Sequence, residues 1–304
     1  MEYVLTTSAL SKKYGKFYAL KELTMHIPKG SVYGFVGRNG AGKTTLIRII
    51  CGLQEPASGE YTLYGTAGGE KGINAVRRRM GAVIEAPALY LDMTAEENLR
   101  QQAILHGLPS YESIPDILKL VGLENTGRKK VRNFSLGMKQ RLGIATALVG
   151  NPDFIVLDEP INGLDPQGIV EIRELILKLN REHGITVLIS SHILGELSKL
   201  ATHYGFIEKG RIVKEISAAE LEAVCRKCLC ADVSDAKALA RTLDAMALDY
   251  EITSENTAKI YGKVSVSELV RALDRENCEL ISIREQDENL EAYFINLVGG
   301  GENA

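Results

Sequence analysis

Hydrophobic residues in the first two thirds of the chain form short runs that alternate with longer segments of helical period. Runs at 31–36, 154–157 and 185–190 consist mainly of apolar residues, which is typical of strands buried on both faces. A helix is predicted after the first run, from Lys43 to Cys51, and another before the third, from Ile169 to His183. This alternation predicts an α/β domain built around a mostly parallel sheet.

Between residues 87 and 150 the pattern becomes mainly helical. Thr94 and Glu97 have the spacing of a capping box, and Ser135 stands where the N-cap of a further helix is expected. Because strands are predicted on both sides of this segment, we expect a helical subdomain inserted into the α/β core.

The pattern changes again after residue 216. A helix is predicted at 217–226, followed by a strand at 228–233, a helix at 235–246, strands at 249–253 and 258–262, a helix at 265–276 and a strand at 279–284. From residue 228 this order is β-α-β-β-α-β, the split ferredoxin-like arrangement of a small α+β domain. The sequence therefore predicts two domains, 1–216 and 217–304.

The composition supports a folded protein that carries no membrane span. Hydrophobic residues make up 45% of the 304 residues and charged residues 25%, enough to bury a core and to exclude wholesale disorder. No stretch approaches the roughly 18 consecutive apolar residues of a spanning helix. The first residues lack a basic leader and an apolar segment, so we expect a cytoplasmic protein. Five irregularly spaced cysteines do not predict a disulfide framework.

Charge is distributed unevenly between the two predicted domains. Residues 1–215 hold 27 basic and 22 acidic residues, a net charge of +5, and the rest hold 9 and 17, a net charge of −8. A change of sign at one point along the chain indicates two units with different surfaces. Neither value demands nucleic acid as a partner, and a mildly positive domain suits small polyanions.

A phosphate-binding motif lies between the first predicted strand and its helix. Residues 37–44 read Gly-Arg-Asn-Gly-Ala-Gly-Lys-Thr and fit G-x-x-x-x-G-K-[ST]. Glycines let backbone N–H groups surround phosphates, and the helix N-terminus adds its dipole. Lys43 is expected to reach the β- and γ-phosphates and Thr44 to bind Mg²⁺. The motif predicts ATP and Mg²⁺ at a site formed by Gly37, Arg38, Asn39, Gly40, Ala41, Gly42, Lys43, Thr44 and Thr45.

A pair of carboxylates follows the apolar run at 154–157. Asp158 and Glu159 stand at the C-terminal edge of that predicted strand, where open α/β sheets bind their ligands. We expect Asp158 to hold the metal, directly or through water, and Glu159 to orient and polarise the attacking water. An Asp-Glu pair can also simply end a strand in solvent, but the upstream phosphate loop favours a catalytic role.

A second anion site is predicted where residues 134–141 read Phe-Ser-Leu-Gly-Met-Lys-Gln-Arg. At this point the sequence resembles the ATP-binding-cassette ATPases, the nucleotide-binding subunits of ABC transporters. The signature of that family is Leu-Ser-Gly-Gly-Gln. Ser135, Gly137 and the trailing Gln-Arg pair match it, whereas Leu136 and Met138 depart from it.

The resemblance implies a head-to-tail dimer that binds two ATP molecules between its subunits. Ser135, Gly137 and Met138 of one subunit would close over ATP held in the phosphate loop of the other. Hydrolysis would remove this bridge and release the interface, a ligand-dependent shift of population. The sequence leaves open whether the second ATPase subunit is another copy of this chain or a paralogue, and a homodimer is our expectation.

Other residues match family positions in the expected order. Asp165 resembles the loop residue that crosses the dimer interface, and His192 resembles the switch histidine that contacts the γ-phosphate. Tyr14 matches the aromatic platform that stacks on adenine, with Phe17 or Tyr18 as alternatives. The resemblance therefore implies a catalytic set of Lys43, Glu159 and His192.

Glu85 departs from the family pattern, which usually has a glutamine that touches Mg²⁺ and transmits the nucleotide state to the membrane subunit. A carboxylate there can strengthen cation binding or repel the γ-phosphate until the metal arrives, so the expected metal set is Thr44, Asp158 and Glu85. This Glu, the Ser-Leu-Gly-Met signature and the ending at 290–294 resemble the bacitracin-resistance and lantibiotic-immunity group. We predict that Glu85→Gln keeps ATP binding but alters coupling to transport.

These features predict the ATP-hydrolysing subunit of a transporter that exports or removes an antimicrobial peptide or another amphiphile. It would dock on a separate transmembrane permease through the helical block around 87–99, as a peripheral protein on the inner face of the membrane, without nucleic acid. One alternative is a soluble regulatory ATPase whose C-terminal domain senses a ligand. Another is an ATPase acting on nucleic acid, but such proteins typically carry tandem cassettes or long coiled-coil inserts.

Overall fold

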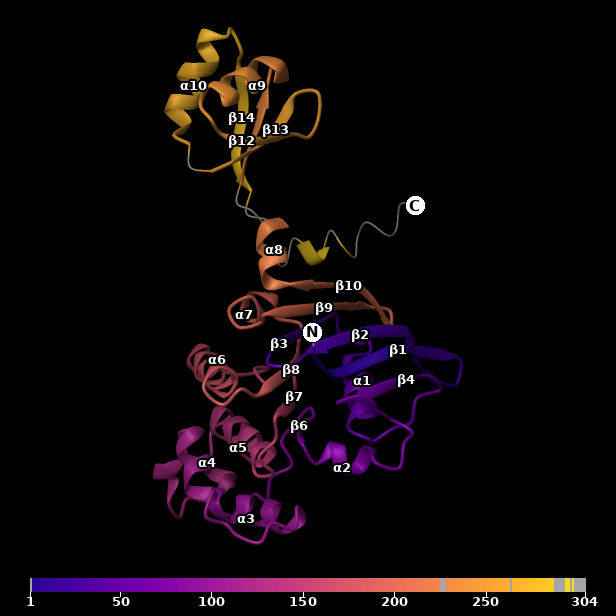
Figure 1. Cartoon of the computed structure of the whole chain (residues 1–304). Helices are drawn as coiled ribbons and strands as arrows, with labels where there is room; N and C mark the ends of the chain where they lie inside the picture. Colours follow the sequence, from indigo (N-terminus) through magenta and orange to yellow (C-terminus); the bar gives the residue numbers. More distant parts are fainter. Residues whose placement is uncertain (1, 225–227, 263, 287–292, 296, 298–304) are drawn as a thin grey trace. The chain divides into compact units, whose positions relative to one another are not determined.

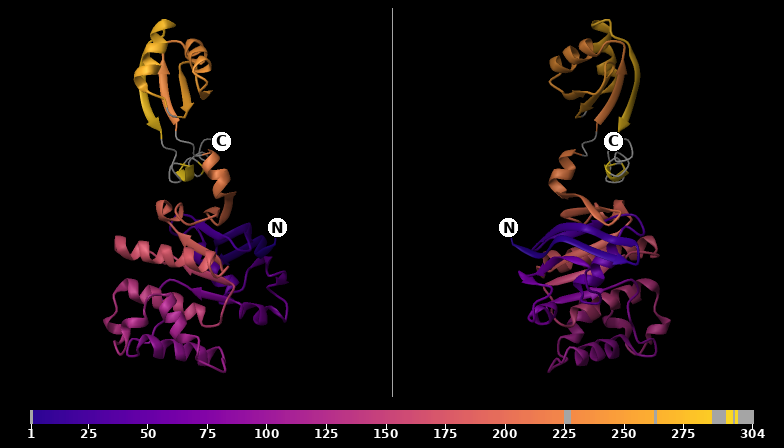
Figure 2. Two further views of the ribbon diagram at one scale, coloured as in Figure 1. Left: turned by 60° about the vertical axis from the view of Figure 1, so that its left-hand side comes forward. Right: turned by 90° about the vertical axis from the view of Figure 1, so that its right-hand side faces the viewer.

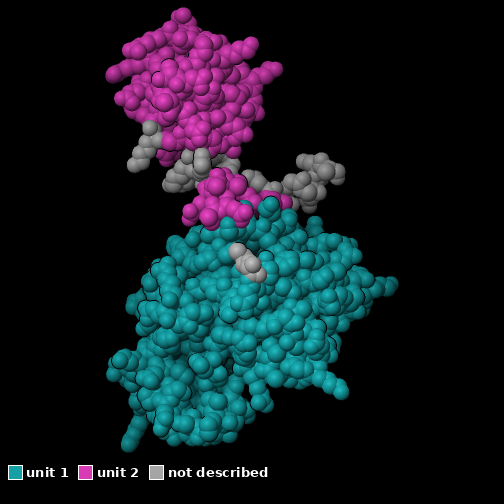
Figure 3. All heavy atoms as spheres, viewed as in Figure 1, with its two compact units in different colours: residues 1–218 teal, residues 219–304 magenta. Residues whose placement is uncertain are grey.

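The computed structural model describes residues 2–224, 228–262, 264–286, 293–295 and 297 (Figures 1 and 2). It divides into two compact units, Met1–Ala218 and Ala219–Ala304, which Figure 3 colours separately. The division falls two residues from the boundary expected from the sequence. Residues 290–292, part of the ending that resembles the bacitracin-resistance group, lie outside the described ranges. Every helix of the described ranges is too short or too polar to cross a bilayer.

A six-stranded sheet of order β10-β9-β3-β8-β7-β6 forms the centre of unit 1 (Figure 1). Its neighbouring strands pair in parallel except at the β9–β10 edge, so the expected mostly parallel sheet is confirmed. The three central strands, β3, β7 and β8, are buried along their whole length. The strands are β3 (Val32–Val36), β6 (Met80–Val83), β7 (Phe154–Asp158), β8 (Thr186–Ser191), β9 (His203–Glu208) and β10 (Arg211–Ser217).

Four helices of unit 1 lie before or after strands of this sheet along the chain, and the longest of them follows β7. Its N-cap is Asp165, whose side chain accepts a hydrogen bond of 2.9 Å from the Gly168 amide, and Pro166 occupies the first helical position. The helices are α1 (Lys43–Ile50), α2 (Ile73–Arg77), α6 (Pro166–Arg181) and α7 (Leu194–Leu197).

A second, antiparallel sheet of order β2-β1-β4-β5 was not predicted from the sequence. Its two long strands pair with repeated register shifts, and Ala9 and Glu22 have φ angles of 46° and 51°. Each irregularity resets the alternation of inward and outward side chains, so the period of two that marks a strand is lost. The strands are β1 (Tyr3–Tyr14), β2 (Phe17–Pro28), β4 (Ser58–Leu63) and β5 (Thr66–Ala67).

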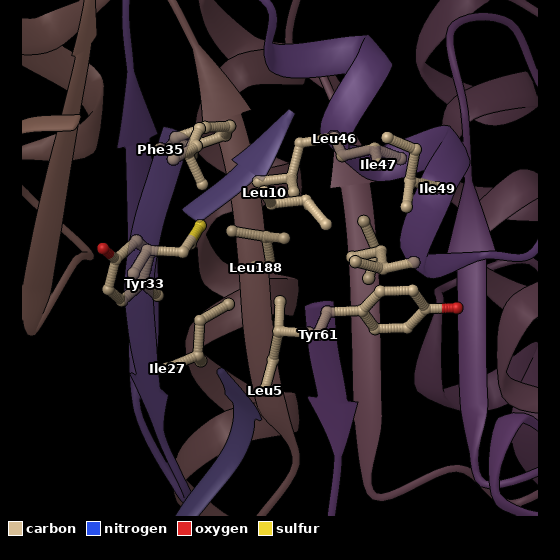
Figure 4. Close-up of a cluster of buried hydrophobic side chains, with 14 of the residues drawn as sticks. Leu5, Leu10, Ile27, Tyr33, Phe35, Leu46, Ile47, Ile49, Tyr61 and Leu188 are labelled. Carbon is tan, nitrogen blue, oxygen red and sulfur yellow. The ribbon is translucent and has the colours of Figure 1, made fainter. Parts of the chain in front are cut away.

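The main core of unit 1 is made by both sheets together with α1 (Figure 4). Leu10 of β1, Phe35 of β3, Leu46 of α1 and Leu188 of β8 are all fully buried within it. Burying apolar surface from four elements in one cluster fixes α1 against both sheets. The loop that precedes α1 is therefore held at a defined place.

Helices predominate between β6 and β7, and they lie together at one end of unit 1 in both views of Figure 2. The capping box of α3 is confirmed: Thr94 Oγ1 accepts from the Glu97 amide at 3.2 Å, and Glu97 accepts from the Thr94 amide at 2.6 Å. Ser135 caps α5 as predicted. The elements are α3 (Ala95–Leu105), α4 (Ile114–Leu120), the 3₁₀ turns η1 (Glu124–Thr126) and η2 (Val131–Asn133), and α5 (Leu136–Leu148).

Unit 2 contains an antiparallel sheet of order β12-β13-β11-β14, which is the order of a split ferredoxin-like domain. Its own core includes the fully buried Leu239, Ile260 and Leu269. Residues 225 and 226, at the end of the first predicted helix, are not among those described. The elements are α8 (Ala218–Val224), β11 (Cys228–Val233), α9 (Ala236–Ala245), β12 (Asp249–Ile252), β13 (Thr257–Tyr261), α10 (Val266–Arg275) and β14 (Leu280–Gln286).

Candidate functional site

The loop between β3 and α1 is packed so tightly that two of its positions require glycine. A Cβ atom on Gly37 would lie 2.6 Å from the carbonyl oxygen of Ile207, and one on Gly42 would lie 2.5 Å from that of Ala19. Gly42 also has a φ angle of 113°, which side chains disfavour. The glycine spacing of the motif is therefore a packing requirement of this fold as well as a feature that leaves the backbone open to phosphate.

Lys43, the first residue of α1, is buried with its ammonium group facing polar partners. Its side chain is 6% exposed, and Nζ donates to the carbonyl oxygen of Gly37 at 2.7 Å. Nζ also lies 3.3 Å from Glu159 Oε1. Because a buried charge requires compensation, these contacts hold the ammonium in place. A phosphate that enters the loop can replace them as the acceptor.

The next residue of α1 meets the carboxylate at the end of β7. Thr44 Oγ1 donates to Asp158 Oδ2 at 2.7 Å, and Ser190 of β8 donates to the other carboxylate oxygen. Asp158 is 1% exposed, so its charge lies at the bottom of the site. A hydroxyl and a carboxylate are the hard oxygen ligands that Mg²⁺ prefers. The residues present therefore fit a Mg²⁺ ion.

Glu159 lies between two cationic or potentially cationic groups. One carboxylate oxygen faces Lys43, and the other lies 2.8 Å from His192 Nδ1. The Glu159 amide donates to Ser190 Oγ at 3.0 Å, and its φ angle of 51° turns the side chain out of the strand direction. Sequence reasoning identified Glu159 and His192 but not the role of Ser190. The sequence feature that could have indicated Ser190 is its place as a polar residue at the C-terminal end of an apolar strand.

A cavity of about 310 Å³ opens beside the phosphate loop. Two aromatic side chains line it: Tyr14, which is 44% exposed and donates to Gln54 Oε1, and Phe17, which is 63% exposed. Tyr18, the third candidate for an adenine platform, instead lines a neighbouring cavity of about 220 Å³. The remaining residues that line the larger cavity are Ala19, Asn39, Gly40, Gly42, Lys43, Thr44, Thr45 and Glu159.

A second cavity of about 500 Å³ brings together the predicted signature and interface residues. Ser135, Gly137 and Met138 lie at the start of α5, and Asp165 lies at the start of α6. Ser135 Oγ accepts from the Met138 amide at 3.2 Å. Within the part of the chain that the structure describes, the residues lining this cavity and those lining the phosphate-loop cavity are entirely different.

Glu85 lies outside both cavities, on the segment that follows β6. Its carboxylate contacts the guanidinium of Arg48 at 2.7 Å, and its side chain is 62% exposed. The structure therefore brings Thr44 and Asp158 together but pairs the third predicted metal ligand with an arginine. Arg48 was not identified from the sequence, because the local sequence around an arginine on a helix surface does not indicate which acidic residue it will contact.

The thiol of Cys51, at the end of α1, adds no charge to this region. Burial raises its pKa to about 12, with a smaller contribution in the same direction from Asp158 and an opposing one from Arg77. The thiol is therefore protonated at neutral pH. The negative charge beside Thr44 comes from carboxylates.

A glycine-rich loop leading from a buried strand into a helix, with an acidic strand end beside it, defines a P-loop nucleotide-binding protein. A sequence model described as "ABC transporter" matches residues 20–162. The bacitracin transport ATP-binding protein BcrA of Enterococcus faecalis is 42% identical over 99% of this chain and 98% of that protein. The chain belongs to the family of ATP-binding subunits of ABC transporters, and it is an ATPase that uses ATP and Mg²⁺.

Two further comparisons extend the likeness. The lantibiotic transport ATP-binding protein SrtF of Streptococcus pyogenes is 43% identical over 70% of this chain and 90% of that protein. The dimeric structure of the ATP-binding cassette MJ0796 in a post-hydrolysis state, bound to ADP and phosphate, superposes with a TM-score of 0.63. It is 28% identical and covers 70% of this chain and 98% of that one.

Proposed function

We propose that this chain hydrolyses ATP, as a homodimer, to drive the export or removal of a peptide antibiotic or a similar amphiphile through a separate membrane-spanning subunit. The substrate class comes from the relatives, one named for bacitracin transport and one for lantibiotic transport. The first match extends over nearly the full length of both chains, which supports a shared role. In this role the chain is peripheral on the cytoplasmic face of the membrane and does not act on nucleic acid.

The observation that supports a dimer is that one chain holds two separate halves of a nucleotide site, in two different cavities. The phosphate loop lines one cavity, and Ser135, Gly137, Met138 and Asp165 line another. Serine-capped helix N-termini bind anions, but the phosphate loop already supplies one such terminus from α1. A second copy turned head to tail would bring the start of its α5 to the γ-phosphate and its Asp165 across the interface. Domains 1–216 and 217–304 would then be the ATPase cassette and an accessory domain.

We assign the steps of ATP hydrolysis to the residues of the phosphate-loop cavity and of the strand ends beside it. Lys43 binds the β- and γ-phosphates in place of its present acceptors. Thr44 and Asp158 would hold Mg²⁺, which when bound neutralises the charge on the phosphates. Glu159 orients the attacking water and accepts its proton. His192 fixes one oxygen of Glu159, so the other oxygen is aimed into the site.

Tyr14 and Phe17 form the walls against which adenine would stack, since both line the phosphate-loop cavity. The membrane subunit would dock on the segment around 87–99. Two large apolar side chains of this segment, Tyr90 and Leu91, are 52% and 50% exposed. These exposed apolar side chains lie a few residues after Glu85, the position that in the family transmits the nucleotide state. Such a surface suits a partner that must respond to that state.

The dimer is tested with Glu159→Gln, which should bind ATP without hydrolysing it. Size-exclusion chromatography with light scattering should show a dimer when ATP and Mg²⁺ are present and a monomer when they are absent. The control is Glu159→Gln combined with Lys43→Ala, which should remain monomeric because the phosphates lose their cation. A Glu159→Gln protein that stays monomeric while nucleotide is bound would refute the proposed dimer.

The substrate class needs a separate test in a susceptible bacterium. Expressing the chain together with a membrane-spanning subunit with which it assembles should raise the inhibitory concentration of bacitracin or of a lantibiotic. The same strain carrying Glu159→Gln should lose that protection, because a trapped dimer cannot cycle. Unchanged sensitivity to both peptides, with ATP-dependent dimerisation intact, would reject the substrate class and leave the ATPase assignment standing.

A further inference from the structure

The loop that follows α1 is bonded to the end of strand β1, beside the phosphate-loop cavity. The hydroxyl of Tyr14, the last residue of β1, donates to Gln54 Oε1 at 2.5 Å. Two residues earlier in β1, Lys12 Nζ donates to the carbonyl oxygen of Glu55 at 2.5 Å. These adjacent contacts hold the end of β1 against the loop.

The direction of this loop is set by the way α1 ends. The Gly52 amide donates to the carbonyl oxygen of Ile49 at 2.9 Å. The Leu53 amide donates to that of Arg48 at 2.8 Å. With its φ angle of 77°, Gly52 completes a Schellman motif, a common helix ending that needs a left-handed residue. Gln54 comes two residues later, so these backbone hydrogen bonds determine where it leaves the helix.

Helix α1 therefore connects the two parts of the nucleotide site. At its start, Lys43 and Thr44 line the phosphate-loop cavity. After its end, Gln54 holds Tyr14, which lines the same cavity. Gln54 is half-buried and is not one of the described residues that line this cavity. Its side chain can therefore act on a bound nucleotide only through the Tyr14 ring.

We propose that Gln54 is a positioning residue, which holds the Tyr14 ring in the orientation on which adenine stacks. This inference rests on the proposed function, in which Tyr14 is one wall of the adenine site. Tyr14 is 44% exposed, so without this hydrogen bond its ring is free to turn toward solvent. Nucleotide binding would then have to immobilise that side chain, which weakens affinity. Lys12 restrains the ring as well, since its Nζ lies 5.6 Å from the ring centroid.

The test compares the affinity of the full chain for ADP, which is not hydrolysed, with its affinity for pyrophosphate, which lacks adenine. Isothermal titration calorimetry in the presence of Mg²⁺ measures both. Gln54→Ala should weaken ADP binding roughly two- to tenfold, the ratio that corresponds to immobilising one side chain, and should leave pyrophosphate binding unchanged. Gln54→Glu keeps an acceptor for the Tyr14 hydroxyl and should retain most of the affinity for ADP.

The hydroxyl itself is tested with Tyr14→Phe, which keeps the ring. This variant should weaken ADP binding as much as Gln54→Ala does. The double variant should show no further loss, because both changes remove the same hydrogen bond. The matched control is Leu53→Ala, which truncates the neighbouring side chain of the same loop. That side chain is 64% exposed, and its loss should leave both affinities unchanged.

Each alternative result has a distinct meaning. Equal losses of affinity for ADP and for pyrophosphate in Gln54→Ala would mean that the loop acts on the phosphate site, which overturns the proposal. Unchanged ADP affinity in that variant, or additive losses in the double variant, would overturn it as well. Tyr14→Ala with full affinity for ADP would instead refute the adenine wall of the proposed function, and this inference with it.

Discussion

At the scale of single residues, Asp158 shows why one partner was predictable and another was not. Thr44 belongs to a motif of fixed spacing, so its approach to a strand-end carboxylate follows from the sequence. Ser190 reaches the same carboxylate because β7 and β8 pair in parallel with Asp158 opposite Ser190. That register joins residues 32 positions apart, and no local pattern specifies it.

Ser190→Ala should reduce ATP hydrolysis roughly tenfold or more, because groups that orient metal ligands commonly have effects of that size. The variant removes a donor from one oxygen of Asp158 and one of two acceptors from the Glu159 amide, which also donates to the carbonyl oxygen of Ser190 at 3.2 Å. Leaving one oxygen of the buried Asp158 carboxylate without its donor should also cost about 1–3 kcal/mol of stability. Steady-state ATPase assays and thermal unfolding measure the two effects.

The matched control is the next residue of the same strand. Ser191 is equally buried, but its hydroxyl accepts from the Ile193 amide on the far side of the strand end. Ser191→Ala should leave most of the ATPase activity. If both variants lose activity to the same extent, the contact between Ser190 and Asp158 has no special role.

At the scale of elements, α5 links the signature residues to the segment that contains Glu85. Gly143, two turns after Ser135, lies so close to Pro87 that a Cβ atom would be 2.6 Å from the proline ring. The segment after β6 therefore packs directly against α5 at this point. Helix boundaries and caps were predictable here from local spacing, whereas this contact between α5 and Pro87 was not.

Gly143→Ala should therefore destabilise unit 1, although alanine is the better helix former by about 1 kcal/mol. Overpacking against Pro87 costs about 1–3 kcal/mol, so the clash should outweigh the gain. Thermal unfolding measures the net change. Adding Pro87→Gly should restore much of the lost stability, because it removes both ring carbons that the new Cβ would meet. A double variant no more stable than Gly143→Ala would place the strain elsewhere.

At the scale of the whole molecule, each unit has its own core. The main core of unit 1 is drawn from residues 4–207, and the core of unit 2 from residues 231–278. A unit that buries its own apolar surface can fold without the other. This separation agrees with the change of net charge from +5 to −8 near the same point of the chain.

A chain of residues 1–218 should therefore fold and bind nucleotide by itself. We expect a cooperative thermal transition and an affinity for a fluorescent ATP analogue within about twofold of that of the full chain. Because the protein contains no tryptophan, the signal must come from the analogue. An aggregated or non-cooperative fragment would show that unit 2 completes the cassette.

The sequence by itself determined the features that depend on local spacing. These are the phosphate loop, the acids at the end of β7, the caps of α3 and α5, and the β-α-β-β-α-β order of unit 2. Only the tertiary structure decided what depends on pairing between distant segments. Bulges hid the antiparallel sheet, strand register brought Ser190 to Asp158, and side-chain packing paired Glu85 with Arg48. Periodicity records which face of an element is buried, whereas contacts between elements depend on register and packing.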